Sequence, residues 1–387
     1  MARVINNKPT DYVPGRIRMA RIMSAYSMSD LATLLSLTPQ AISQYELGII
    51  RPSDNVMLKM ADILSLPIEF FLKPIDKEPC VQSASFFRRK KTVSVKQRAA
   101  FEEKANFNVE IADYLSQHVD FPDVDFPDMS CFSLKGDIEP IDMDRITDHV
   151  REYWKIQDGP IDNLSDLLQQ HGVIISRIEY PNTKMDAFSK WTNARPYIFL
   201  NAVKSSVRDR FDMAHELGHL LLHTEYTDAD LSESVLYERV ENQANLFAGS
   251  FLMQTKEFFS EIITSSIDRL IVLKKKWKVS VGSMIYKIQD YDLLTASQIE
   301  YLKRQMTERG MWRGEPFDDI AEYDSPDILK QAIDVIFEEK LASISEINSN
   351  IPIFSWMTEF ICCLPPGYLT PKQENQVRIK PKLRIVE

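Results

Sequence analysis

Residues 210–219 read RFDMAHELGH, and this stretch decides how the larger part of the chain folds. His215 and His219 are four residues apart, so a helix projects both imidazoles from one face, close enough to bind a single ion. Glu216 lies one step around that helix, where it can sit beside a metal-bound water without being a ligand. Apolar residues surround the motif, which predicts a buried helix over residues 206–224. The pattern indicates metal-assisted hydrolysis with Glu216 as the general base.

The burial of this helix favours a metal, because two histidines and a carboxylate are costly to bury without compensation. A histidine pair that binds no metal remains the alternative. A catalytic zinc needs a third protein ligand and one position left for water. The next predicted helix offers Glu241, with Glu238 one turn earlier as its competitor. His223 lies a further turn beyond His219, so we expect it to support the site rather than to bind the ion.

The motif and its surroundings resemble the ImmA/IrrE family of zinc metallopeptidases. The similar stretches are 210–219, 241–248 (ENQANLFA), 251–253 (FLM), 273–280 (LKKKWKVS) and 302–306 (LKRQM). The resemblance covers most of residues 140–315 and implies a zincin-like domain. It also implies that His215, His219 and Glu241 bind Zn²⁺ while Glu216 acts as the base. One departure is Gln254, where the family usually has proline after the Leu-Met pair.

Three runs rich in β-branched or aromatic residues precede the metal-binding helix. They predict strands over Val173–Ile178, Asp186–Trp191 and Pro196–Asn201. Helical patterns dominate elsewhere, including one clear amphipathic helix over Asp327–Leu341. The sequence therefore predicts a mainly α protein with a small sheet, in the α+β class.

The amino-terminal residues 1–75 predict five short helices. Their expected bounds are Arg16–Ala25, Ser29–Leu35, Pro39–Glu46, Asn55–Leu64 and Ile68–Leu72. Ser29, Thr38 and Ser53 are N-cap candidates, and Gly48 stands where a left-handed residue often closes a helix. The second and third helices would form a helix-turn-helix with a shared core of Leu31, Leu34, Leu35 and Ile42.

This segment resembles the Xre family of lambda-type repressors through residue 72. The resemblance implies that the helix Pro39–Glu46 enters the major groove of double-stranded DNA. Gln40 and Gln44 are placed to read base edges, because glutamine can pair bidentately with adenine. The expected phosphate contacts are Thr38, Ser43 and Tyr45. Arg21 and Glu46 match a buried ion pair of the relatives, whereas Met28 stands where many of them have a phosphate-binding glutamine.

Charge is distributed unevenly along the chain, whose net charge is −10. Residues 1–75 carry eight Lys/Arg and six Asp/Glu, a balance of +2 that leaves −12 for the remainder. Only the amino-terminal part is therefore suited to approach phosphates. A helix-turn-helix used for protein contact is the alternative. The basic run Arg88–Lys91 can add phosphate contacts, although a solvated linker is the favoured interpretation.

These features predict four segments: a DNA-binding domain (1–75), a linker with a connecting helix (76–139), a metallopeptidase domain (140–315) and a helical carboxyl-terminal region (316–387). The four cysteines are scattered, without a Cys-x-x-Cys motif, and the amino terminus lacks a secretory signal. No apolar run is long enough to cross a bilayer. We therefore expect a cytoplasmic protein that does not bind membranes.

Two functions fit the sequence. The first is a DNA-binding transcriptional regulator whose zinc endopeptidase cuts a protein partner, such as a repressor or a toxin-related protein. The second is an antitoxin or phage-related repressor that acts by DNA and protein binding, with a structural or inactive zinc site. Because helix-turn-helix domains usually read two half-sites, a homodimer is expected. The predicted helix Ser94–His118 is our candidate for its interface.

Overall fold

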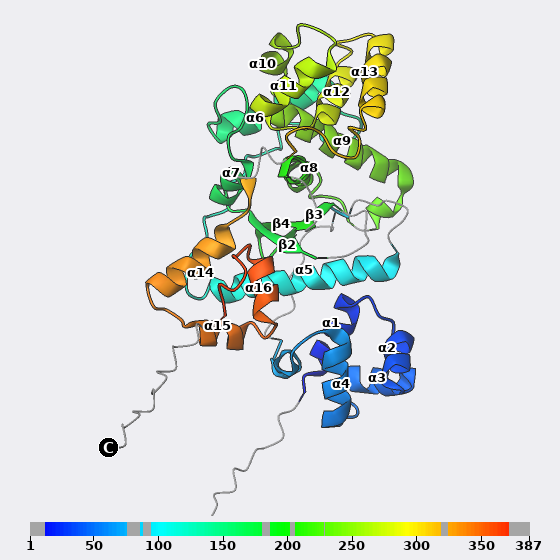
Figure 1. Cartoon of the computed structure of the whole chain (residues 1–387), viewed down its shortest axis with the longest axis vertical. Helices are drawn as coiled ribbons and strands as arrows, with labels where there is room; N and C mark the ends of the chain where they lie inside the picture. Colours follow the sequence, from blue (N-terminus) through cyan, green and yellow to red (C-terminus); the bar gives the residue numbers. More distant parts are fainter. Residues whose placement is uncertain are drawn as a thin grey trace, which may run out of the picture.

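The computed structural model describes residues 12–75, 86–87, 94–179, 186–201, 206–227, 229–318 and 324–370. Within these ranges the chain is mainly helical and holds one small mixed sheet near its centre (Figure 1). The α+β class predicted from the sequence is confirmed. None of the helices in these ranges is both long and apolar enough to cross a membrane.

Four α-helices and a 3-10 turn form the amino-terminal bundle. They are α1 (Pro14–Met23), α2 (Met28–Leu35), α3 (Pro39–Glu46), α4 (Asp54–Leu64) and η1 (Ile68–Leu72). Thr38 and Ser53 cap α3 and α4 through their side-chain oxygens, as predicted. Gly48 has a φ of 70° just after α3, so the expected left-handed residue is present.

Two details of the α2 prediction were wrong. The cap of α2 is Ser27 rather than Ser29, because Ser27 forms a reciprocal capping box with Asp30 three residues later. Leu34 is 50% exposed and lies outside the core, whereas Leu31 and Leu35 are buried. The latter two are one turn apart and share the inward face, which Leu34 does not.

Helix α5 (Val95–Leu115) runs between the amino-terminal bundle and the sheet (Figure 1). A capping box between Ser94 and Gln97 begins it. The buried Arg16 of α1 forms an ion pair with Glu110 of α5, at 2.5 Å between Nη2 and Oε1. Helix α5 therefore uses much of its apolar surface within the chain, including residues that we expected at a dimer interface.

Four strands form the sheet in the order β1-β3-β4-β2. Their bounds are β1 (Phe86–Phe87), β2 (Ile174–Ile178), β3 (Ala187–Thr192) and β4 (Arg195–Asn201). Strands β3 and β4 form an antiparallel hairpin, and β2 joins β4 in parallel. Asn193 and Ala194 turn the hairpin with φ values of 52° and 59°, the left-handed pair that suits a two-residue turn.

The two faces of the sheet pack against different helices. Phe188 and Phe199 belong to a core shared with the amino-terminal bundle, α5 and the carboxyl-terminal helices. Ile198 and Leu200 belong to the second core, which surrounds the helix that carries the histidines. Alternation along the strands thus places consecutive residues in different cores.

The second core is built from helices on the far side of the sheet from α5. They are α6 (Pro140–Tyr153), α7 (Leu164–Gln170), α8 (Ser206–Leu222), α9 (Ser234–Leu252), α10 (Thr255–Ser260), α11 (Ile267–Trp277), α12 (Val281–Asp290) and α13 (Ala296–Glu308), with a short turn η2 (Asp230–Ser232). Helices α8 and α9 make the most extensive contact between elements. A Cβ on Gly218 would lie 3.1 Å from the ring of Phe247, so glycine allows this close approach.

The carboxyl-terminal helices return to the first core. They are α14 (Ile328–Glu338), α15 (Ile344–Asn350) and α16 (Ser355–Ile361), and both α14 and α16 contact β2. A buried ion pair between Arg210 and Asp324 joins α8 to the segment before α14. The predicted linker residues Arg88–Lys91 lie outside the described residues, and the four-segment division stays a prediction.

Candidate metal centre

The histidine motif lies on α8 where this helix is covered on almost every side. The sheet contacts one face of α8 and α9 contacts another. His215, Glu216 and His219 are all buried, with at most 5% of each residue exposed. This burial matches the prediction made from the apolar residues of the helix.

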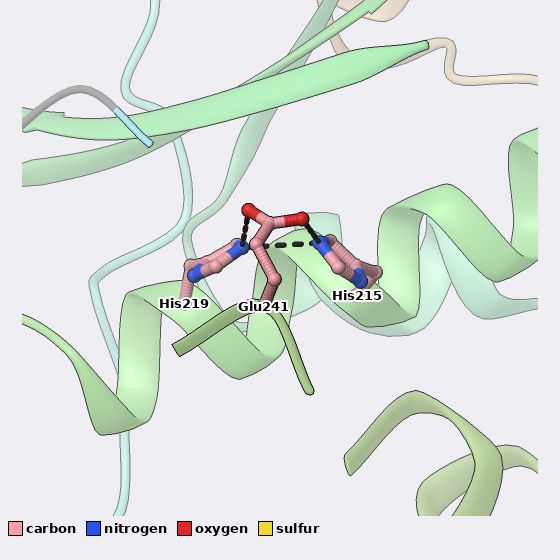
Figure 2. A group of neighbouring side chains, drawn as sticks. All are labelled: His215, His219 and Glu241. Atoms are coloured by element: carbon pink, nitrogen blue, oxygen red, sulfur yellow. Dashed lines mark hydrogen bonds and ion pairs between the residues drawn. The ribbon is translucent and has the colours of Figure 1, made fainter. Parts of the chain in front are cut away.

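Three side chains converge between α8 and α9 (Figure 2). The Nε2 atoms of His215 and His219 are 3.0 Å apart. The carboxylate of Glu241 lies 3.8 Å from Nε2 of His215 and 3.5 Å from Nε2 of His219. The structure therefore places Glu241 with the histidine pair, whereas its competitor Glu238 is exposed.

These separations fit a small divalent cation. Ligand atoms about 2.1 Å from a tetrahedral zinc stand about 3.4 Å apart, and the observed values of 3.0, 3.5 and 3.8 Å bracket that spacing. Three protein ligands leave one tetrahedral position for water. The residues present thus suit the catalytic type of zinc site.

Hydrogen bonds behind His215 orient its ring. Its Nδ1 lies 3.0 Å from Oδ1 of Asn245, which can only accept, so Nδ1 carries the proton. Nε2 therefore presents its lone pair toward Glu241. Asn245 follows Glu241 by four residues on α9, so one helix face carries both groups.

A longer chain of contacts orients His219. Gln243 donates through Nε2 to the carbonyl of Gly136, which turns its Oε1 toward Nε2 of His223 at 2.8 Å. The Nε2 of His223 then carries its proton and its Nδ1 accepts from Nδ1 of His219 at 3.0 Å. Burial, followed by the neighbouring His219, lowers the pKa of His223 to about 3, so the ring is neutral. His223 lies behind His219, as expected for a supporting residue.

Glu216 stands apart from the three converging groups. Its Oε2 accepts a 2.6 Å hydrogen bond from Oγ of Ser189 on β3. Ser189 points toward α8 because it shares the strand face of Ala187 and Trp191. Sequence reasoning missed Ser189, since a lone serine in a strand carries no signal until the strand is placed over the helix.

The helix-turn-helix residues are presented on a separate part of the molecule (Figure 1). Thr38 and Gln40 are exposed at the start of α3. Ser43, Gln44 and Tyr45 are half-buried.

An ion pair stabilises the recognition helix. The guanidinium of Arg21 holds the carboxylate of Glu46 through two hydrogen bonds of 2.5 and 2.9 Å, which confirms the predicted pair. Both side chains are largely buried, so the pair attaches the end of α3 to α1.

Comparison with known families agrees with the description of the histidine site and of the helix-turn-helix. A peptidase-family model described as the IrrE N-terminal-like domain matches residues 168–289. A helix-turn-helix model matches residues 17–71. A search of curated proteins found no match.

Proposed function

Because the chain joins an Xre-like helix-turn-helix domain to an IrrE-like domain of a metallopeptidase family, we propose that it is a DNA-binding regulator with a zinc-dependent endopeptidase. Its substrate would be a protein partner such as a repressor or a toxin-related protein. The convergence of His215, His219 and Glu241, with the buried Glu216 next to His215 on the same helix, is the observation that carries this proposal.

The three converging residues would hold the zinc. When bound, zinc supplies Lewis acidity, which polarises a peptide carbonyl and lowers the pKa of water to about 7. The hydrogen bonds to Asn245 and His223 engage Nδ1 of each imidazole, so the Nε2 lone pairs would be available to hold the zinc.

Glu216 would move the proton. Its buried carboxylate is held by Ser189, and it can accept a proton from the attacking water and pass it to the leaving amine. The hydroxyl of Ser189 fixes the direction of the carboxylate.

The amino-terminal domain would bind double-stranded DNA. Gln40 and Gln44 would read bases, and the exposed Thr38 with Ser43 and Tyr45 would contact phosphates. A homodimer that reads two half-sites and a cytoplasmic location both fit such a domain and belong to this proposal.

Replacing Glu216 by glutamine tests the proposed chemistry. The variant should bind zinc as the wild type does, because Glu216 is not among the three converging residues. It should also lose the ability to hydrolyse the partner protein. That partner is first identified by testing which product of the neighbouring genes the zinc-loaded wild type cleaves. Zinc content by metal analysis and cleavage by gel electrophoresis are the two measurements.

The same variant distinguishes the alternative function. If Glu216→Gln keeps the full regulatory effect in cells, the protein acts as an antitoxin-like or phage-repressor-like binding protein and the peptidase proposal is wrong. Ser189→Ala is a milder variant, because it keeps the carboxylate of Glu216 but removes the hydrogen bond to it. It should slow hydrolysis without abolishing it.

A further inference from the structure

Strand β3 runs along the turn of α8 that carries His219. Oγ of Ser189 donates to Oε2 of Glu216 at 2.6 Å, and Nε1 of Trp191 donates to the carbonyl of Leu220 at 3.2 Å. These two contacts lie about one helical turn apart, so they fix the direction of β3 relative to the candidate metal centre. A segment added at the outer edge of β3 would lie about 4.8 Å from the strand that holds Glu216.

That outer edge is occupied by the chain's own strand β1. The sheet order β1-β3-β4-β2 places β1 beside β3, and the two strands are antiparallel. Phe86 lies opposite Ser189, and Phe87 lies opposite Phe188. Residues directly opposite each other in an antiparallel pair have Cα atoms about 4.5–5.5 Å apart. The backbone of Phe86 is therefore the neighbour of the residue that holds the proposed base.

The pairing of β1 with β3 is short. Strand β4 pairs with β3 over all six residues from Ala187 to Thr192, whereas β1 pairs with two of them in the described part of the chain. The edge of a sheet presents backbone N–H and C=O groups that can pair with another chain. Because main-chain hydrogen bonds form with any sequence, an extended segment of another protein can replace β1 at this edge.

The position of β1 in the sequence keeps it near this edge. Strand β1 lies between η1, which ends at Leu72, and α5, which begins at Val95. Helix α5 is itself attached to the sheet, since Nδ2 of Asn108 donates to Oγ of Ser176 on β2 at 2.9 Å. A segment tethered in this way has a high effective concentration at its binding site, which favours it over a separate protein.

We propose that residues 86–87 act as an internal competitor of the protein substrate. They occupy the edge of β3 beside Glu216, so a substrate segment must displace them before it reaches the metal centre. The consequence for hydrolysis rests on the proposed peptidase function. The competition for the edge does not, because it is measured as binding.

Proline substitutions test the competition, because proline lacks the backbone N–H that a paired strand needs. The parent is the zinc-loaded full chain with Glu216→Gln, which prevents turnover, and the proline variant adds Phe86→Pro and Phe87→Pro. The probe is a fluorescent synthetic peptide with the sequence of residues 83–90, SASFFRRK, and its Kd is measured by fluorescence anisotropy. If β1 occupies the edge about nine-tenths of the time, the proline variant should bind the peptide about tenfold more tightly than the parent.

The matched control carries Phe86→Ile and Phe87→Ile. Isoleucine keeps the backbone N–H and favours strands, so the Kd should stay within about twofold of the parent value. Hydrogen exchange of residues 186–192, followed by mass spectrometry, should be faster in the proline variant than in this control, and the peptide should slow it again. If circular dichroism shows that the proline variant is unfolded, Phe86→Gly with Phe87→Gly applies the same test, because glycine weakens a strand.

The outcomes separate this proposal from the proposed function. With Glu216 restored, the proline variant should cleave the partner protein faster than the isoleucine control does. An unchanged Kd and unchanged exchange in the proline variant would overturn the competitor, even where the partner protein is cleaved. Cleavage of the wild type within residues 83–90 would also overturn it, because the segment would then be a substrate. Tighter peptide binding without hydrolysis of any protein would leave the competitor standing and refute the peptidase function.

Discussion

Replacing Asn245 by alanine should weaken zinc binding although Asn245 does not lie among the converging ligands. Its Oδ1 accepts a hydrogen bond from Nδ1 of the buried His215 at 3.0 Å, which leaves Nε2 of this ring free to bind the zinc. Loss of such a supporting hydrogen bond typically lowers metal affinity about 10–100-fold, or about 1.4–2.7 kcal/mol. The loss of affinity for this variant should lie near the lower limit of that range. A cavity of about 800 Å³ is lined by Asn245, and it can admit a water molecule to replace the lost acceptor. We therefore expect about a tenfold loss.

Zinc affinity is measured by competition with a chelator of known affinity at neutral pH. Asn242→Ala is the matched control: Asn242 lies on the same helix, is exposed, and its side chain makes no hydrogen bond within the described residues. Asn245→Leu excludes water as well as removing the acceptor, and should approach the hundredfold loss. If Asn245→Ala binds zinc within about twofold of the wild type, the orientation argument for His215 is wrong.

Three further predictions concern other parts of the molecule. Glu241→Gln should lower zinc content strongly while Glu238→Gln leaves it unchanged, because only Glu241 lies with the histidines; equal losses in the two variants would refute the assignment. Burial lowers the pKa of the fully buried Lys190 from 10.5 to about 8, although the charges of nearby glutamates oppose this shift. Between these two pH values the unfolded chain therefore binds more protons than the folded chain. The stability of the wild type relative to Lys190→Met should therefore rise by about 3 kcal/mol from pH 8 to 10.5, measured by urea unfolding, and a flat difference would contradict the shift. Gln40→Ala should weaken binding to DNA selected by the wild type by about tenfold with little change in salt dependence, whereas a change in the salt slope would indicate a phosphate contact instead.

Local sequence patterns predicted the helices well where caps and apolar spacing agreed. Helix α3 begins at Pro39 after the Thr38 cap and ends at Glu46, as expected. The cap of α2 was misplaced because Ser27 and Ser29 both stand at its start, and only the capping box with Asp30 identifies Ser27 as the cap. The hairpin turn at Asn193 and Ala194 contains no glycine, so asparagine was the sole sequence signal for its left-handed conformation.

The candidate site was predicted only in part. His215, Glu216 and His219 lie within one helical turn, so their relation follows from helix geometry. Glu241 required a choice against Glu238, since both precede the apolar part of α9 and only the packing of α9 on α8 decides between them. Ser189 lies on strand β3, and its hydrogen bond to Glu216 becomes evident only when β3 is placed beside α8.

The sequence by itself determined what periodicity and spacing encode: the helix-turn-helix, the histidine pair and the glutamate beside it, and the mainly α class. Those features depend on contacts between residues a few positions apart. The tertiary structure decided which carboxylate meets the histidines and that α5 packs between the sheet and the amino-terminal bundle. Such features depend on how separate elements pack against one another. Local sequence patterns do not encode close packing between residues that are far apart in the chain.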